Sequence, residues 1–108
     1  MQAQFLTENF AVSPQISVAD LEQAKELGVS TIVCNRPDGE TPDQTPAQDI
    51  AQAAEAAGMD FHFIPMMGAA FTQKDVDRLR EAMSNASGKV LAYCRSGNRS
   101  SILWQASQ

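Results

Sequence analysis

Short apolar runs alternate with longer amphipathic stretches along this chain. The apolar runs are rich in aliphatic and aromatic residues and have the length of buried strands, at positions 10–12, 29–34, 59–64 and 89–93. In the third run, Phe61 and Phe63 fall on one face of a strand, whereas His62 and Ile64 fall on the other. The pattern therefore predicts four strands.

Between these runs, apolar residues recur at the spacing of amphipathic helices. Ser17, Thr45 and Thr72 are typical helix N-caps, and Thr45 is followed by a proline at the first helical position. The first two helices are expected to end at Gly28 and Gly58, and the third to end before Gly88. A fourth helix is expected to begin near Arg99 and to be cut short by the end of the chain.

Strands that alternate with helices of this length imply parallel strands joined by right-handed crossovers. We therefore expect an α/β fold, a three-layer sandwich in which helices flank a small parallel sheet. The chain has 108 residues, of which 44% are hydrophobic and 19% charged, as in one compact domain. A single domain over 1–108, with a truncated C-terminal helix, is the predicted organisation.

Net charge and composition limit the classes of molecule that this chain is expected to bind. The net charge of −5 makes nucleic acid and acidic membrane surfaces unfavourable partners, because their phosphate groups repel the average surface of the protein. No apolar run reaches membrane-spanning length and the first ten residues do not resemble a secretory signal, so a cytoplasmic location is expected. Two cysteines and one histidine form no metal-binding cluster, and the sequence suggests no cofactor.

The segment from Cys94 to Ser100, CRSGNRS, carries the chemistry. It joins a predicted strand to a helix N-terminus, where successive backbone N–H groups form an anion-binding loop. Gly97 permits the tight turn, and Ser96 and Asn98 are expected to shape the loop. The same N–H groups stabilise a thiolate, so Cys94 is the predicted nucleophile, with a core thiol as the alternative.

The side chains after this cysteine have expected roles of their own. Arg99 is spaced to fold back over a bound anion with two parallel donors. Arg95 either adds to this positive charge or faces solvent, and the Ser100 hydroxyl could donate to the sulfur of Cys94. Cys34 ends a neighbouring strand, where it either resolves an oxidised Cys94 or is a core cysteine.

Several motifs in register resemble one bacterial family. VSPQIS at 12–17, NRPDGE at 35–40, Ile64-Pro65 and VLAYCRSGNRS at 90–100 look like the phosphatase-like domain (DUF442) of beta-lactamase hydrolase-like proteins. The resemblance implies a dual-specificity-phosphatase-like fold, with Cys94 as nucleophile and Arg99 as oxyanion binder. It also implies possible fusion or association with a metallo-β-lactamase-like hydrolase.

The sequence departs from ordinary members of the cysteine-dependent phosphatase superfamily at three points. Four residues instead of five separate Cys94 from Arg99, and Tyr93 stands where those phosphatases usually carry histidine. The segment after Pro65, MMGAA, has no carboxylate to serve as general acid. Asp38 is the best substitute in the sequence, although Pro-Asp-Gly is also an ordinary turn.

Two enzymatic functions and one binding function follow from these features. The first is a cysteine-dependent phosphatase-like hydrolase that acts on a small phosphate ester or a phosphoprotein through a covalent thiol intermediate. The second is a rhodanese-like sulfurtransferase that carries a persulfide on Cys94, because rhodaneses use the shorter loop and sulfur transfer makes less demand on a general acid. The third is an anion-binding module without turnover. In each case the expected partner is a small anionic molecule.

Overall fold

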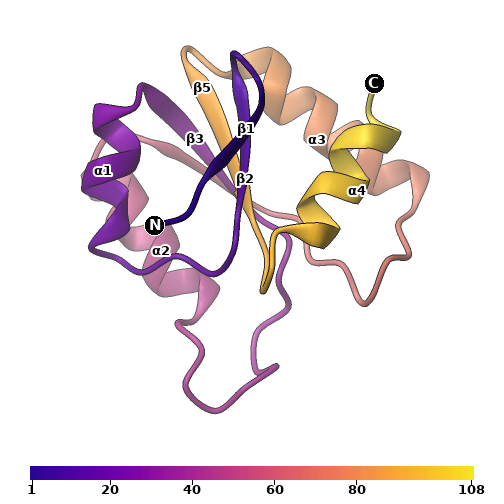
Figure 1. The fold of residues 1–108 in the computed structure, drawn as a ribbon, viewed down its shortest axis with the longest axis horizontal. Helices are drawn as coiled ribbons and strands as arrows, with labels where there is room; N and C mark the ends of the chain where they lie inside the picture. Colours follow the sequence, from indigo (N-terminus) through magenta and orange to yellow (C-terminus); the bar gives the residue numbers. More distant parts are fainter.

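The computed structural model describes residues 1–108 and contains five strands and four helices (Figure 1). In chain order these are β1 (Gln4–Thr7), β2 (Phe10–Ser13), α1 (Asp20–Glu26), β3 (Val29–Cys34), α2 (Ala47–Ala56), β4 (Asp60–Phe63), α3 (Gln73–Asn85), β5 (Lys89–Tyr93) and α4 (Asn98–Ala106).

The five strands form one sheet in the order β1-β2-β5-β3-β4. Strands β2, β5, β3 and β4 run parallel, as predicted, and Cys34 at the end of β3 pairs with Tyr93 at the end of β5. Strand β1 was not predicted and pairs antiparallel with β2. It is mostly exposed at the sheet edge, so its sequence lacks the apolar signal of a buried strand.

Helices cover both faces of the sheet, which confirms the predicted three-layer α/β sandwich (Figure 1). One core cluster joins α1 and α2 to the sheet through residues such as Leu21, Ile32 and Ile50. The other joins α3 and α4 to the opposite face through Val33, Leu79 and Leu103. Burial of these aliphatic side chains fixes the sheet between its two helical layers. No helix is both long and apolar enough to span a membrane.

The helix ends agree with the predicted caps to different degrees. Thr72 forms a capping box with Asp75, in which the Asp75 N–H donates to Thr72 Oγ1 and the Thr72 N–H donates to Asp75 Oδ2. The prediction that Ser17 caps the first helix is wrong, because α1 begins at Asp20 with Ala19 at the N-cap. Helix α2 has Pro46 rather than Thr45 at its N-cap, without a cap from that residue's own side chain.

Candidate active site

Cys94 lies where β5 ends at the carboxyl edge of the sheet. Its backbone N–H donates to the Ser13 carbonyl of β2 over 3.3 Å, and four residues later the chain has entered α4. We call residues 94–100 the cradle. Gly97 has φ +93°, in the left-handed region that favours glycine, and it is the N-cap of α4. The structure thus has the predicted strand, tight turn and helix N-terminus.

Backbone N–H groups surround the Cys94 sulfur. The Gly97 N–H donates to Sγ over 3.0 Å within a buried environment. Burial is the largest single influence on the pKa of the Cys94 thiol and raises it, but the N–H groups of Ser100, Ser96, Arg99 and Gly97 together outweigh burial. The pKa of Cys94 therefore lies below its ordinary value, which favours the nucleophilic thiolate.

The guanidinium of Arg99, within the cradle, is held by a carboxylate that the sequence analysis did not identify. Arg99 Nη1 donates to Glu40 Oε2 over 2.7 Å, and Nη2 donates to Glu40 Oε1 over 2.8 Å. Nη1 also donates to the Met66 carbonyl oxygen over 2.9 Å. A guanidinium has five N–H groups, so these contacts leave one on Nε and one on Nη2. Those two form a fork that can hold a bound anion.

Glu40 also contacts a second arginine. Arg36 is buried, and its Nε donates to Glu40 Oε1 over 3.0 Å, the oxygen that also accepts from Arg99. The hydrogen bond from Arg99, followed by that from Arg36, lowers the pKa of Glu40 to about 2 against the opposing effect of partial burial. Glu40 is therefore ionised near neutral pH and holds no proton to donate to a leaving group.

Asp38 does not take part in the cradle. Its Oδ1 accepts the Ala47 N–H over 2.8 Å and so caps the first turn of α2. Asp38 thereby provides a partner for one of the free N–H groups at the start of α2, where the Pro46 N-cap has no side-chain cap of its own. This contact favours the structural turn interpretation of Asp38 over the role of general acid.

Ser100 contributes to the site through its backbone. Its hydroxyl donates to Asn35 Oδ1 over 2.8 Å, and Asn35 Nδ2 donates to the Ile64 carbonyl over 2.8 Å. Both residues are fully buried. The sequence analysis suggested that this hydroxyl donates to the Cys94 sulfur, but its proton is directed to Asn35. The Ser100 N–H instead faces the thiol.

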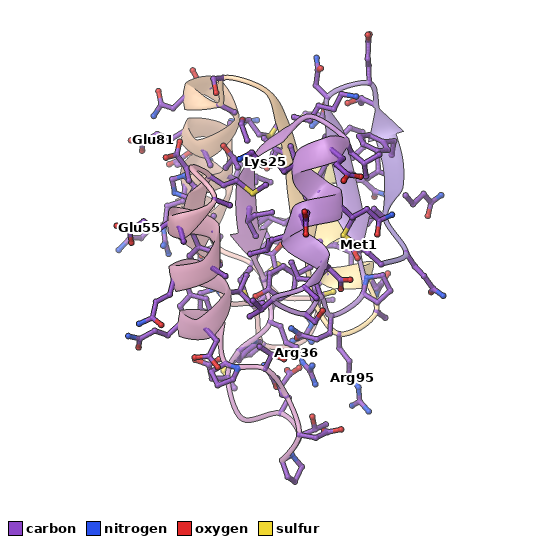
Figure 2. All side chains as sticks on the ribbon, turned by 90° about the vertical axis from the view of Figure 1, so that its left-hand side faces the viewer. Met1, Lys25, Arg36, Glu55, Glu81 and Arg95 are labelled. Carbon is purple, nitrogen blue, oxygen red and sulfur yellow. The ribbon has the colours of Figure 1, made fainter.

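No hydrogen bond links the side chain of Arg95, Ser96 or Asn98 to the Cys94 sulfur. The side chain of Arg95 is exposed, as one of the two sequence interpretations has it (Figure 2). Ser96 Oγ accepts the Asn98 N–H over 3.3 Å, a contact within the loop that agrees with a shaping role. Arg95, Ser96 and Asn98 are exposed, whereas the backbone N–H groups of this loop face the Cys94 sulfur.

Cys34 is packed in the core cluster beneath α1 and α2. Its Sγ donates to the Arg36 carbonyl over 3.3 Å, and burial raises the pKa of its thiol. Both cysteines are free thiols. The environment of Cys34 is that of a core cysteine, so Cys94 is the stronger candidate for a reactive thiol.

The loop after Pro65 is connected to the site by backbone contacts. The Met66 N–H donates to the Asn35 carbonyl over 2.9 Å, and the Met66 carbonyl accepts from Arg99. Met67 is 83% exposed and Phe71 is 42% exposed, and between them there is no acidic side chain. The loop therefore orients Arg99 but supplies no proton donor.

Comparison with known proteins gives concordant matches. The phosphatase-like domain of beta-lactamase hydrolase-like protein matches residues 2–108. A beta-lactamase hydrolase-like protein of Agrobacterium fabrum is 36% identical over 104 residues, which are 96% of this chain and 24% of that protein. The chain thus spans about a quarter of the length of the curated relatives that it matches.

Two solved structures share both the sequence pattern and the fold. A candidate phosphatase from Neisseria meningitidis is 42% identical with a TM-score of 0.82, over 93% of this chain and 71% of that chain. A DUF442 protein from Shewanella putrefaciens is 25% identical with a TM-score of 0.81, over 98% of this chain and 66% of that chain. This fold matches the arrangement implied by the sequence motifs.

Proposed function

Because this chain belongs to the phosphatase-like domain family of beta-lactamase hydrolase-like proteins, we propose that it is a cysteine-dependent phosphatase whose nucleophile is Cys94. Its substrate would be a small phosphate ester or a phosphoprotein. The observation that carries the proposal is a thiol of lowered pKa that is surrounded by backbone N–H groups, beside an arginine with two free donors.

In the first step, the Cys94 thiolate attacks phosphorus, the S–P bond forms and the ester P–O bond breaks. The leaving oxygen departs with the electron pair of that bond. The cradle N–H groups and the Nε and Nη2 donors of Arg99 stabilise the charge that develops on the phosphoryl oxygens. In the second step, water attacks phosphorus, a P–O bond forms and the S–P bond breaks with its electron pair returning to sulfur. Inorganic phosphate leaves as dihydrogen phosphate with both hydrogens of the water, and the thiolate of Cys94 is restored.

The leaving group receives little help in this site. Glu40 is ionised and Asp38 is engaged with the N-terminus of α2. Proton donation by a positioned acid typically contributes about a hundredfold or more, so alkyl esters should react slowly. Aryl phosphates, whose leaving groups are stable as anions, are the esters that suit this arrangement.

A second candidate function is favoured by the same lack of a proton donor. As a sulfurtransferase, Cys94 would attack the outer sulfur of thiosulfate, so that a persulfide forms on Cys94 and sulfite leaves with the electron pair. An acceptor thiolate would then take the outer sulfur and restore the Cys94 thiolate. Sulfite leaves without protonation, and the four-residue spacing between Cys94 and Arg99 agrees with a small anion.

One paired assay tests both proposals. The wild type, Cys94→Ser and the control Cys34→Ser are each supplied with an aryl phosphate and, separately, with thiosulfate and a thiol acceptor. Phosphate release that is lost only in Cys94→Ser supports the phosphatase. Sulfur transfer with a one-sulfur mass increase on Cys94, without phosphate release, overturns the phosphatase in favour of the sulfurtransferase. Stoichiometric anion binding without either turnover refutes both and leaves a binding module.

A further inference from the structure

A second pocket of about 290 Å³ lies beside the cradle, between its rim and the loop that precedes α2. None of its seven lining residues is hydrophobic. Two are arginines, Arg36 and Arg95, one is Asp43, and the other four carry amide or hydroxyl groups. Figure 2 shows Arg36 and Arg95 at the same end of the molecule. Such a lining suits a charged or strongly polar group and excludes an apolar one.

Arg36 forms a fixed wall of this pocket. It is only 4% exposed, and each of its three side-chain nitrogens donates a hydrogen bond, to Glu40, to Gln15 and to Thr41. The terminal nitrogens each retain one further N–H group. Because the side chain is already held, a ligand that accepts from it need not immobilise a flexible arginine.

Arg95 provides the unengaged charge. Its guanidinium makes no hydrogen bond or ion pair with another residue, so its donors are available to a ligand. Its backbone is nevertheless anchored, since the Arg95 carbonyl accepts the Gln15 N–H over 3.4 Å. Arg95 also follows the nucleophile directly in the chain, which places the start of its side chain at the rim of the cradle.

The pocket and the cradle are joined through one carboxylate. Glu40 Oε1 accepts from Arg36 Nε on the side of the pocket and from Arg99 Nη2 on the side of the cradle. A molecule with its reactive group at Cys94 could therefore extend along this pair of arginines into the pocket. The only acidic residue in the pocket lining is Asp43, which is exposed and makes no ion pair.

We propose that this pocket binds a second anionic group of the substrate, a carboxylate or a phosphate, and that Arg95 determines this preference. The proposal rests on the function proposed above, because it takes the first anionic group to occupy the cradle. A guanidinium offers paired donors to either group. Asp43 repels the same group, so the two residues act with opposite sign on one binding step.

Phosphonates test the proposal without turnover, because their C–P bond is not cleaved by a thiolate. Calorimetric titration compares methylphosphonate with phosphonocarboxylates of two to four carbons, and in a second arm with alkyl bisphosphonates of the same lengths. In the wild type, at least one two-anion probe is expected to bind about tenfold more tightly than methylphosphonate. The arm that contains it identifies the second group as carboxylate or phosphate.

Two variants are expected to change the preference for the two-anion probe in opposite directions. Arg95→Gln should bring the affinity ratio of the two-anion probe to methylphosphonate to within about twofold, whereas Asp43→Asn should raise that ratio severalfold. A wild-type ratio near one for every probe, an unchanged ratio in Arg95→Gln, or a lower ratio in Asp43→Asn would each overturn the proposal. A preserved ratio in a protein without phosphatase activity would refute the proposed function but not this pocket, whereas failure of every phosphonate to bind would refute both.

Discussion

Replacement of Glu40 by glutamine removes the charge that holds Arg99 beside the cradle. The amide keeps the size and one acceptor oxygen of the carboxylate, but not the second acceptor or the negative charge. The two Arg99 contacts of 2.7 and 2.8 Å and the Arg36 contact of 3.0 Å should therefore weaken together. We expect a less stable protein and a less well-positioned Arg99.

The size of the stability effect follows from the pKa of Glu40. Lowering it from the ordinary value of 4.5 to about 2 corresponds to at most about 3–4 kcal/mol. The side chain is 28% exposed and solvent screens part of the interaction, so we expect a loss of about 1–2 kcal/mol near neutral pH. Because the pKa is lower in the folded protein, this stabilisation is present above about pH 4.5 and is lost as the pH falls towards 2.

Urea unfolding of the wild type and Glu40→Gln between pH 7 and pH 3 measures this difference. Glu81→Gln, on α3 and far from the cradle in Figure 2, is the matched control and should change the unfolding free energy little at any of these pH values. In an assay with an aryl phosphate, kcat/KM of Glu40→Gln should fall about tenfold because the Arg99 fork is no longer fixed. A stability difference that stays constant from pH 7 to pH 3, or that is absent at pH 7, would refute the reasoning.

Three further predictions concern the parts that support the cradle. Asp38→Ala should lower the unfolding free energy by about 1 kcal/mol through loss of the α2 cap, and kcat on an aryl phosphate should change less than about twofold. A large loss of kcat with an altered pH profile would instead identify Asp38 as the general acid. Ser100→Ala leaves the buried Asn35 Oδ1 without its donor and should cost about 1–3 kcal/mol in urea unfolding, while titration of thiolate absorbance should show a nearly unchanged Cys94 pKa, since the backbone N–H stays. Gly97→Ala introduces a Cβ that lies 3.5 Å from the Ser13 carbonyl carbon, an ordinary van der Waals distance, so its cost of about 1–2 kcal/mol should come from the left-handed backbone alone. The same titration should show a raised Cys94 pKa, because the Gly97 N–H donates to the sulfur, and an unchanged stability would contradict this prediction.

Local sequence was sufficient to predict most of the framework. The four apolar runs became β2, β3, β4 and β5, and Thr72 capped α3 as expected, because periodicity and capping act over a few neighbouring residues. The same holds for the cradle. Cys94, Gly97 and the start of α4 are contiguous, so the order of strand, turn and helix was contained in one short segment.

The structure around that segment depended on residues far apart in the chain. Glu40 lies 59 positions from Arg99, and Asn35 lies 65 positions from Ser100. Nothing in a local pattern distinguishes Glu40 from Asp38 as the arginine's partner, since both lie in the same turn-forming loop. The place of the NRPDGE motif after a strand that ends at the same sheet edge as Cys94 was a signal for the loop as a whole, but it did not separate the two carboxylates.

The sequence by itself thus determined the alternation of strands and helices and the place of Cys94 between a strand and a helix N-terminus. Only the tertiary structure decided which carboxylate holds Arg99, that the Ser100 hydroxyl donates to Asn35, and that β1 completes the sheet as an exposed edge strand. The physical reason is that these contacts form between side chains or strands that meet only when β3 and β5 pair and both helical layers pack on the sheet.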